Sequence, residues 1–532
     1  MSYISAVKKN ETVFVWERDN DGNRVTKSYP APFYFYSGDK NGKHTSLYGE
    51  PLERYDFTSD SEFYNTRKKA IQHGYDLYES DIPPELKILS EHYYNVPAPK
   101  LNVTFYDIEV DYDTSIGFSS PSNPYAAVNA IAMFHTHKNQ MVVIAIPPKD
   151  ANCDVPDVGV AGEDYIKKMN DITPIIDGVD IVIEFYKTEK EVLERFLLEI
   201  EDTDLICGWN NSGFDDPYMG KRLELMGKKY FNKMSFVDAP NPKWKMVEIF
   251  GKEQPVIELF GRVSLDYLTL FKKYMIENQP SYKLDNIADK FLRTDGKPDM
   301  PKLEYEGSLA RLYKDDFDYF IRYNIRDTEI LFGFENKLKY VALANEMVHL
   351  STGLFQHVAG TIKLHELSVI NYCHHEMGGV IVNDKRDNDW GEEKIKGAIV
   401  LDPVTGMHEW SSSIDLNSLY PSVIRANNIS PETKIGQFKL EEAAVDHIRR
   451  KSDTQLIFEK VNGKIISKTG ADWRKYLLDH NWCISGFGTV FNMNKQGVVP
   501  KILEDWYAKR KTYQKQMIEA KDAAAKILEK YK

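Results

Sequence analysis

Short runs in which apolar and polar residues alternate dominate the first hundred residues, and these runs are rich in Tyr and Phe. The runs Thr12–Trp16 and Pro32–Tyr36 predict strands, so we expect a small β-rich domain over residues 1–100. Its last part, Glu91–Lys100, ends in Asn-Val-Pro-Ala-Pro-Lys. Because prolines interrupt both helices and strand ladders, this stretch is predicted to be a linker.

Beyond the linker the pattern changes to strands interspersed with helices, which indicates an α/β region. An amphipathic helix is predicted over Thr188–Ile200, where Thr188 and Glu191 have the spacing of a capping box. The runs Val247–Phe250 and Val256–Phe260 flank Gly251–Pro255 in the pattern of a β-hairpin. Strands are predicted at Asn102–Val110, Ala127–His135, Met141–Ile146 and Leu205–Trp209.

The C-terminal part begins with helical periodicity and then returns to strand patterns. Asp316–Lys339 is predicted to be one helix, and helical segments continue from Ala342 to about Met377. From about Ile502 to Lys532 helix-forming residues continue without Gly or Pro, so a long helix is expected. Strands are predicted at Val380–Val382, Ala398–Leu401 and Ser411–Leu416.

The 532-residue length suggests roughly three to five domains. Hydrophobic residues make up 42% and charged residues 28%, which is typical of globular protein rather than disorder. No apolar run approaches the length of a membrane span, and Met1–Val15 does not resemble a signal peptide. The four cysteines lie far apart and form no CxxC pair, so neither a zinc site nor a disulfide framework is expected. This cysteine usage fits a reduced, cytoplasmic compartment.

The net charge of −12 weakens a nucleic-acid-binding hypothesis without excluding it. Proteins that coat nucleic acid gain affinity by placing Lys and Arg on phosphates. Acidic residues can nevertheless gather where a site holds divalent cations, while basic residues line a groove elsewhere.

Two acids share one predicted strand. In Val103-Thr-Phe-Tyr-Asp-Ile-Glu-Val110, Asp107 and Glu109 lie on one face, and Tyr106 and Ile108 on the other. Two carboxylates so placed repel each other unless a cation lies between them. Taken alone, the pair is more often a solvated strand face than a metal site.

A third acid follows the strand predicted at Leu205–Trp209. In Cys207-Gly-Trp-Asn-Asn-Ser-Gly-Phe-Asp215, Phe214 is expected to anchor a polar turn from which Asp215 projects. The same string fits a helix N-cap equally well, with Asp215 or Asp216 accepting backbone N–H groups before Pro217.

The fourth acid lies on the helix predicted at Asp316–Lys339. In Tyr323-Asn-Ile-Arg-Asp327 the tyrosine and the aspartate are four residues apart, hence on one helix face. Tyr323 could hydrogen-bond an attacking water while Asp327 binds metal. A surface Tyr/Asp pair is the simpler interpretation of this string alone.

Together the three strings resemble the exonuclease motifs of family B DNA polymerases. The resemblance implies an RNase H-like fold in which Asp107, Glu109, Asp215 and Asp327 hold two Mg²⁺ ions and Tyr323 orients the hydrolytic water. Oxygen-only ligands suit Mg²⁺, with Mn²⁺ as a possible substitute, better than zinc. Gln279-Pro-Ser-Tyr-Lys-Leu-Asp285 and the hairpin near Gly251 also match this family, where the hairpin helps to separate primer from template.

A polymerase motif follows. Ser413-Ile-Asp-Leu-Asn-Ser-Leu-Tyr-Pro-Ser422 resembles motif A of the polymerase palm. The resemblance implies that Asp415 and Leu416 bind the metals of that site. It also implies that Ser418 and Leu419 offer backbone N–H groups to the triphosphate and that Tyr420 excludes a ribose 2′ hydroxyl.

The terminal helix resembles the first fingers helix of the family, where Arg510 would grip the triphosphate. Close relatives have a lysine one turn later, where this chain has Gln514, so Lys515 would supply the charge there. Ile395 stands where the family usually has a tyrosine, which puts in doubt a role of that segment in passing primer ends between sites. Asp202-Thr-Asp204 copies the aspartate spacing of the missing polymerase hairpin, but it precedes motif A and is not expected to be catalytic.

The expected fold class is an α/β and α+β multidomain chain. The expected domains are a β-rich N-terminal domain over 1–100, completed by about 341–385, and an RNase H-like 3′–5′ exonuclease domain over 101–340. A partial palm is expected over 386–495 and the first fingers helix over 496–532.

By resemblance, the substrates are primer–template DNA and dNTPs, and the reaction belongs to phage genome replication in the cytoplasm of an infected bacterium. The motifs of the second fingers helix and of the second catalytic aspartate are absent from the sequence. Polymerisation is therefore expected to need a second chain carrying the remaining fingers, palm and thumb, through which a sliding clamp would also bind. Neither a membrane partner nor a membrane span is expected.

Two alternatives remain. One is a stand-alone exonuclease on single-stranded DNA, against which Tyr420 and Arg510 count, since a hydrolase needs neither. The other is a non-catalytic module that binds nucleic acid or promotes assembly, against which the complete set of exonuclease acids counts.

Overall fold

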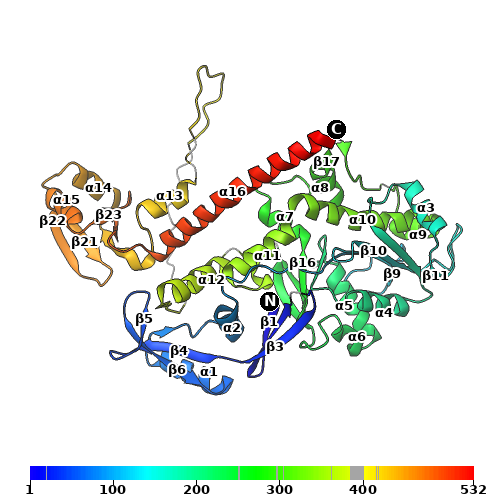
Figure 1. Cartoon of the computed structure of the whole chain (residues 1–532), viewed down its shortest axis with the longest axis horizontal. Helices are drawn as coiled ribbons and strands as arrows, with labels where there is room; N and C mark the ends of the chain where they lie inside the picture. The colour runs from blue at the N-terminus through cyan, green and yellow to red at the C-terminus, as the bar shows by residue number, and fades with distance from the viewer. Residues whose placement is uncertain are drawn as a thin grey trace. The chain divides into compact units, whose positions relative to one another are not determined.

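The computed structural model describes residues 1–19, 21–249, 252–294, 297–303, 305–360, 362–383, 401–414, 416 and 418–531. The chain divides into two compact units, each built from separate stretches of sequence (Figure 1). The first unit comprises Met1–Phe33, Asp56–Tyr64 and Ile82–Ser368, and the second comprises Tyr34–Tyr55, Asn65–Asp81 and Val369–Lys532.

The first unit begins with a three-stranded antiparallel sheet of β1 (Ser2–Lys9), β2 (Thr12–Arg18) and β3 (Arg24–Pro30). Helix α2 (Pro84–Tyr93) packs against β1 and β2. The linker predicted from Glu91 is therefore wrong at its start, because its first residues complete the last turn of α2. From Tyr94 to Asn102 the chain has neither helix nor strand.

The main sheet of this unit has seven strands in the order β11-β12-β10-β9-β8-β13-β16. Strand β9 pairs antiparallel with both β8 and β10. Strands β8, β13 and β16 run parallel to one another. The strands predicted here are confirmed to within one or two residues at each end. Their bounds are β8 Val103–Asp111, β9 Ala127–His135, β10 Gln140–Ala145, β11 Gly159–Val160, β12 Asp180–Phe185, β13 Leu205–Gly208 and β16 Val263–Asp266.

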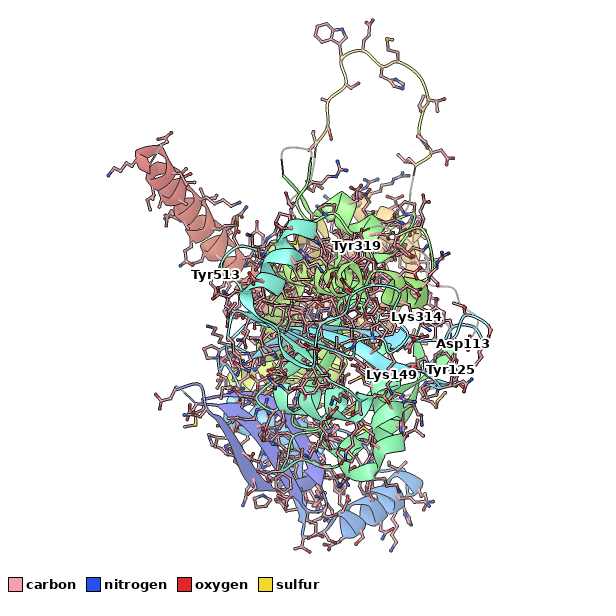
Figure 2. All side chains as sticks on the ribbon, turned by 90° about the vertical axis from the view of Figure 1, so that its right-hand side faces the viewer. Asp113, Tyr125, Lys149, Lys314, Tyr319 and Tyr513 are labelled. Atoms are coloured by element: carbon pink, nitrogen blue, oxygen red, sulfur yellow. The ribbon has the colours of Figure 1, made fainter. Side chains whose placement is uncertain are left out.

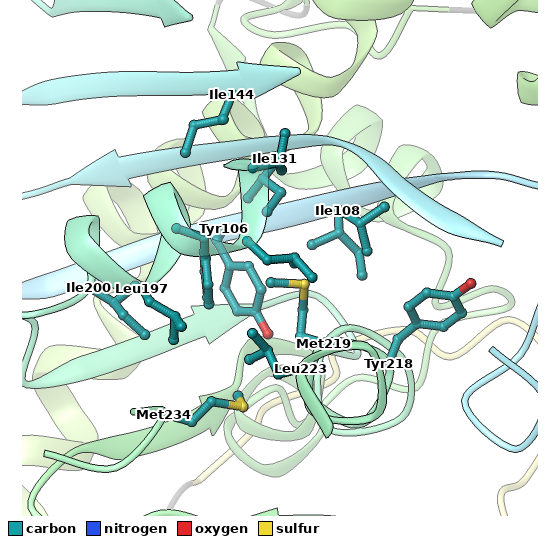
Figure 3. Close-up of a cluster of buried hydrophobic side chains, with 14 of the residues drawn as sticks. Tyr106, Ile108, Ile131, Ile144, Leu197, Ile200, Tyr218, Met219, Leu223 and Met234 are labelled. Atoms are coloured by element: carbon teal, nitrogen blue, oxygen red, sulfur yellow. The ribbon is translucent and has the colours of Figure 1, made fainter. Parts of the chain in front are cut away.

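Helices cover both faces of this sheet. On one face α4 (Glu189–Glu199) and α5 (Asp215–Met226) pack over Tyr106 and Ile108 of β8, as Figure 3 shows. On the other face α10 (Phe317–Leu338) contacts β8 and β9. The alternation predicted for β8 is thus confirmed: its even-numbered residues enter the apolar core, and its odd-numbered acids face α10.

The structure confirms the predicted start of α4. Thr188 and Glu191 form the expected capping box, in which each side chain accepts from the other's backbone N–H. Asp316 caps α10 by accepting from the Tyr319 amide at 3.1 Å. A hairpin is present, as β14 (Lys243–Ile249) and β15 (Lys252–Glu258), with its tip outside the described residues. Its turn is shorter than the predicted Gly251–Pro255, because Lys252–Pro255 pair with β14 as part of β15. Other elements of this unit are α3 Glu163–Ile172, α6 Lys228–Asn232, α7 Tyr267–Tyr274, α8 Leu284–Phe291, β17 Arg293–Thr294, β18 Lys297–Pro298, α9 Leu309–Asp315, α11 Tyr340–Ser351 and η1 Phe355–His357.

The Asp202-Thr-Asp204 string has a structural role. Asp204 is fully buried and accepts hydrogen bonds from Arg18 and Arg24, which lie on the N-terminal sheet. Its carboxylate therefore ties that sheet to the start of β13.

The second unit holds two further sheets. One has the order β19-β5-β6-β4-β7 and the other β22-β21-β20-β24-β23. The second sheet, with α14 and α15, has its own apolar core around Phe458 and Trp473. Bounds in and near this unit are β4 Phe33–Gly38, β5 His44–Ser46, β6 Pro51–Phe57, α1 Asp60–Gln72, β7 Leu77–Tyr78, α12 Lys363–Tyr372, η2 Cys373–Met377, β19 Gly379–Val380, α13 Leu419–Ala426, η3 Pro431–Thr433, β20 Lys434–Phe438, α14 Glu441–Arg449, β21 Gln455–Lys460, β22 Ile465–Thr469, α15 Gly470–Asp479, β23 Trp482–Ile484, β24 Thr489–Asn492 and α16 Val498–Tyr531.

One predicted strand of this unit is wrong. The described residues of Ser411–Leu416 have no strand structure, because no described strand lies beside them to complete a ladder. Most of Ala398–Leu401 lies outside the described residues, as do Ile395 and Asp415. All four cysteines are free, and no helix among the described residues is long and apolar enough to cross a membrane.

Candidate active site

Three elements bring the predicted exonuclease residues together. Strand β8 supplies Asp107 and Glu109, the start of α5 supplies Asp215, and α10 supplies Tyr323 and Asp327. Because β8 and β13 are parallel neighbours, the segment after β13 returns to the end of β8 that carries the acids. Helix α10 packs over the face of β8 that carries Asp107 and Glu109.

Hydrogen bonds join these elements directly. The backbone N–H of Ile108 donates to Asp215 Oδ1 at 3.3 Å, which links β8 to α5. Asn324 Nδ2 donates to Asp107 Oδ2 at 3.0 Å, which links α10 to β8. The five residues predicted from three separate strings therefore lie in one site.

The alternative interpretation of Asp215 as a helix cap is not observed. Helix α5 begins at Asp215, its N-cap is Phe214, and this N-cap makes no side-chain capping hydrogen bond. Asp216 instead accepts from three neighbours, the Tyr106 hydroxyl, Asn211 Nδ2 at 3.0 Å and Ser264 Oγ at 2.5 Å. Asp216 thus stabilises the turn, while Asp215 faces the other acids.

The electrostatics are those of crowded carboxylates. Burial, followed by the negative charge of Asp327, raises the pKa of Asp107 from 3.8 to about 7. Burial and the neighbouring acids also hold the pKa values of Glu109 and Asp215 well above their usual range. Burial raises the pKa of Asp327 as well. Four acids held this close cannot all ionise at low energetic cost unless positive charge is supplied.

Lys302, which supplies part of that charge, was absent from the residues predicted for the site. Its Nζ lies 3.0 Å from Asp327 Oδ2 and 4.9 Å from the centre of the Tyr323 ring. Burial and then the Asp327 charge raise the pKa of Tyr323, whereas Lys302 opposes that rise. Lys302 lies in a segment without helix or strand, where no periodicity or spacing marks a residue.

The donor set fits a hard divalent cation. Asp327 Oδ1 is buried and has no hydrogen-bond partner in the described part of the chain. No three His, Cys, Asp or Glu side chains among the described residues are already at metal-ligand spacing. The four carboxylates would have to move closer together to share a cation, which would offset the mutual repulsion that, after burial, raises the pKa values of Asp107 and Glu109.

A groove opens beside these acids. Its volume is about 1200 Å³, and Lys302 and Tyr323 lie in its wall. Three more aromatic side chains line it, from Trp209, Tyr282 and Tyr305. Polar lining residues include Asn210, Lys283, Asp285, Asn286 and Asp289, so part of the predicted Gln279–Asp285 string forms this wall.

A second aromatic feature, also absent from the predicted set, lies beside Asp215. The Phe118 side chain is 63% exposed, yet its ring centre lies 5.3 Å from that of Tyr112 and 5.4 Å from that of Phe214. The Tyr125 hydroxyl donates to carbonyls of this loop, and Figure 2 labels Tyr125 close to Asp113 of the same loop. An exposed ring therefore packs on Phe214, the residue that precedes Asp215.

The predicted polymerase residues lie in the second unit. Ser418, with φ of 53°, precedes α13, and Arg510 Nη1 of α16 donates to Ser418 Oγ at 3.3 Å. Leu416, Leu419 and Tyr420 are exposed. The structure thus brings Ser418 and Arg510 together, while Asp415 lies outside the described residues.

Comparison with known proteins agrees with this arrangement. A family model described as DNA polymerase family B, exonuclease domain, matches residues 61–287. A second, described as DNA polymerase family B, matches residues 364–531. The chain belongs to DNA polymerase family B.

Individual members of family B are similar over much of the chain. The DNA-directed DNA polymerase of Escherichia phage RB69 is 27% identical over 451 residues, which is 82% of this chain and 48% of the relative. The DNA-directed DNA polymerase of Enterobacteria phage T4 is 26% identical over 348 residues, 65% of this chain and 35% of the relative. A DNA polymerase of Desulfurococcus sp. (strain Tok) is 26% identical over 259 residues, 47% and 31% respectively. The chain spans at most about half the length of these family B relatives.

Proposed function

We propose that this chain is a metal-dependent 3′–5′ proofreading exonuclease joined to the N-terminal part of a DNA-directed DNA polymerase. The observation that carries the proposal is the meeting of Asp107, Glu109, Asp215 and Asp327 with Tyr323 and Lys302 in one groove-side cluster. A solvated strand face or a surface Tyr/Asp pair would not gather two buried and two half-buried acids with raised pKa values.

The sheet supports an RNase H-like assignment for residues 101–340. Its central strands run β10-β9-β8-β13-β16, with an antiparallel meander followed by parallel strands. This order puts the acids of β8 next to the segment that follows β13, and α10 packs over the face of β8 that carries these acids. The four acids would hold two Mg²⁺ ions, or Mn²⁺ in their place.

The chemistry follows from these positions. Bound Mg²⁺ would supply Lewis-acid activation of a water and neutralise the leaving 3′ oxygen of an in-line displacement. Tyr323 would orient the attacking water through its hydroxyl. This hydroxyl is protonated at neutral pH, and its raised pKa keeps it protonated at alkaline pH as well. Lys302 would hold Asp327 ionised and the Tyr323 ring in place. Asn324 would fix the Asp107 carboxylate through the hydrogen bond that it donates.

The groove fits an unpaired 3′ end. Trp209, Tyr282 and Tyr305 offer ring surfaces on which bases of any sequence can stack. Phe118 offers another exposed ring next to Asp215. Proofreading needs such tolerance of sequence, because any base can be misincorporated.

The polymerase half is supported by residues that a hydrolase does not need. The contact between Arg510 and Ser418 brings a guanidinium beside the turn at the start of α13. A triphosphate would bind there between Arg510 and the N–H groups of Ser418 and Leu419. Tyr420 would lie under the deoxyribose, and Asp415 and Leu416 would bind the metals of this second site.

A second chain carrying the remaining fingers, palm and thumb would complete polymerisation. The described residues before α13 expose apolar side chains almost completely, with Met407 at 96% and Trp410 at 98%, and Leu401, Val404 and Ile414 are also exposed. Figure 1 draws this stretch, in yellow, as an extended loop without paired strands. Such a surface fits the addition of palm strands from another polypeptide.

Helix α16 exposes a second apolar surface of the kind that a partner helix covers. Apolar side chains that are alternately four and three residues apart form one seam along the helix, and the larger of them are exposed. The seam consists of Tyr513 (labelled in Figure 2), Met517, Ala520, Ala524 and Ile527. An apolar helix of the second chain would pack along it.

The remaining assignments complete the proposal. Residues 1–100 with about 341–385 form the N-terminal domain, 386–495 the partial palm and 496–532 the first fingers helix. DNA and dNTPs are the substrates, a sliding clamp would bind through the other chain, and the host cytoplasm is the site of action.

The test uses a primer–template with a mismatched 3′ end and Mg²⁺, with the primer labelled at its 5′ end in one set and at its 3′ end in another. A 5′ label should yield a ladder of stepwise shortened primers, and a 3′ label should yield a labelled mononucleotide at once. Addition of dNTPs should give no extension by this chain alone. Cleavage in the reverse polarity, or internal cleavage, would contradict the proposal, and extension would contradict the need for a second chain.

A further inference from the structure

The module formed by residues 434–492 carries a surface that neither active site uses. Its five strands and two helices enclose their own core, in which Trp473 Nε1 donates to the Leu456 carbonyl at 3.1 Å. Ten Lys and Arg stand against seven Asp and Glu in this stretch, a net charge of +3, whereas the whole chain carries −12. The module is therefore a basic part of an acidic protein.

At one end of that core three aromatic rings form a cluster. The centre of the Tyr476 ring lies 4.0 Å from that of His480 and 5.6 Å from that of Trp482, and the latter two are 5.0 Å apart. Tyr476 and Trp482 are partly buried against the core, and His480 is exposed. The rings are thus fixed on their inner side and reach solvent on the other.

Two lysines lie over these rings. Lys468 Nζ is 4.9 Å from the Tyr476 centre and Lys460 Nζ is 5.5 Å from the Trp482 centre. Arg474 and Lys475 on α15 are exposed nearby in sequence. Rings flanked by flexible ammonium groups can take a base on a ring face while the lysines move to the adjacent phosphates.

We propose that the cluster of Lys460, Lys468, Tyr476, His480 and Trp482 binds single-stranded nucleic acid without sequence preference, as a site separate from the exonuclease groove. A duplex does not fit this chemistry, because its bases are stacked on each other and offer no free face. An acidic peptide fits the charge but leaves the three clustered rings without a role.

The test measures binding of a labelled 20-nucleotide oligo-dT to the full chain by fluorescence anisotropy, in EDTA and in an Asp107→Ala, Glu109→Ala background. We expect Lys460→Glu with Lys468→Glu to weaken binding at least 10-fold and to reduce the salt dependence. The slope of log Kd against log salt should fall by about 1.4, at about 0.7 for each phosphate that a lysine no longer neutralises. The matched control is Lys167→Glu with Lys190→Glu, an equal charge change on exposed helix surfaces, which should shift Kd less than threefold.

A second variant tests the rings without disturbing the core. His480 is exposed, so His480→Ala should fold, weaken oligo-dT binding about 5- to 100-fold and be rescued by His480→Phe. Photocrosslinking of a thiothymidine oligonucleotide should label peptides within 434–492.

Three results would overturn the proposal: equal affinity for a blunt duplex of the same length, no change beyond twofold in either cluster variant, or crosslinks confined to other segments. Displacement of oligo-dT by polyglutamate at equal charge concentration would assign the surface to an acidic protein segment instead. The cluster variants are also made with Asp107 and Glu109 intact, and their primer shortening is measured. This assay tests the proposed exonuclease independently of the proposed nucleic-acid site, so the two proposals can fail separately.

Discussion

Replacing Asp107 by Asn tests whether the four acids really form a cation site. Asp107 has a pKa of about 7 in the folded chain, against 3.8 as its ordinary value. Because the folded pKa is the higher one, the metal-free chain should lose stability as pH rises from about 4 to about 7. Each pH unit in this window is worth about 1.4 kcal/mol, so the full cost above pH 7 is about 4 kcal/mol, and solvent reaching the partly exposed carboxylate reduces it to roughly 2–4 kcal/mol.

Asp107→Asn removes this cost. In EDTA at pH 8 the thermal unfolding midpoint of the variant should lie above that of the wild type, whereas at pH 4 the two should coincide. Addition of Mg²⁺ should raise the midpoint of the wild type at pH 8, since an ion that binds only the folded chain stabilises it. The variant should lose most of that Mg²⁺ response together with primer shortening.

The control is Asp113→Asn, an exposed carboxylate on the following loop whose hydrogen bonds to Ser115 lower its pKa. It should not raise the midpoint at pH 8 and should keep the Mg²⁺ response. The reasoning would be refuted if Asp107→Asn destabilised the metal-free chain at pH 8, or if it responded to Mg²⁺ as the wild type does.

Three further predictions concern other parts of the chain. Lys302→Met should cut the rate of primer shortening at least 10-fold. It should also move the acid limb of the pH–rate profile to higher pH, because Lys302 lowers the pKa values of Asp107 and Asp327. Lys302→Arg should restore the profile, and an acid limb that does not move in Lys302→Met would exclude this electrostatic role of Lys302. Asp204→Asn breaks a buried ion pair and should cost about 3–5 kcal/mol in urea unfolding, whereas Asp202→Asn, 60% exposed, should cost less than about 1 kcal/mol; equal losses would argue against the buried tie. Met407→Ser with Trp410→Ser should reduce self-association in sedimentation experiments without changing primer shortening, and unchanged association would show that the exposed loop is not adhesive.

Much of the first unit could be predicted because its signals are local. Apolar runs of strand length predicted the strands Ala127–His135 and Met141–Ile146, and the capping box predicted the start of α4. The four acids of the candidate site were recognisable because each lies at a fixed place in a local string. Their joining required the resemblance to a family, since nothing in the sequence spacing brings Asp327 to Asp107.

The errors and omissions have one physical cause, which is that the deciding partner lies far away in sequence. Lys302 acquires its role from Asp327 and Phe118 from Phe214, and neither pair follows any helical or strand period. The structural role of Asp204 depends on two arginines of the N-terminal sheet, which donate hydrogen bonds to its carboxylate. Ser411–Leu416 alternates like a strand, yet a strand also needs a neighbour, and no described strand provides one.

The central claim is tested most directly by an assay of primer shortening on a 5′-labelled mismatched primer–template with Mg²⁺ and dNTPs. The assay compares the wild type with an Asp107→Ala, Glu109→Ala double variant. The account predicts stepwise 3′–5′ shortening by the wild type that never turns into extension, and no shortening by the variant or in EDTA. Shortening that persists in the purified double variant, or none by a folded wild-type chain, would contradict the claim that these acids form a working exonuclease site.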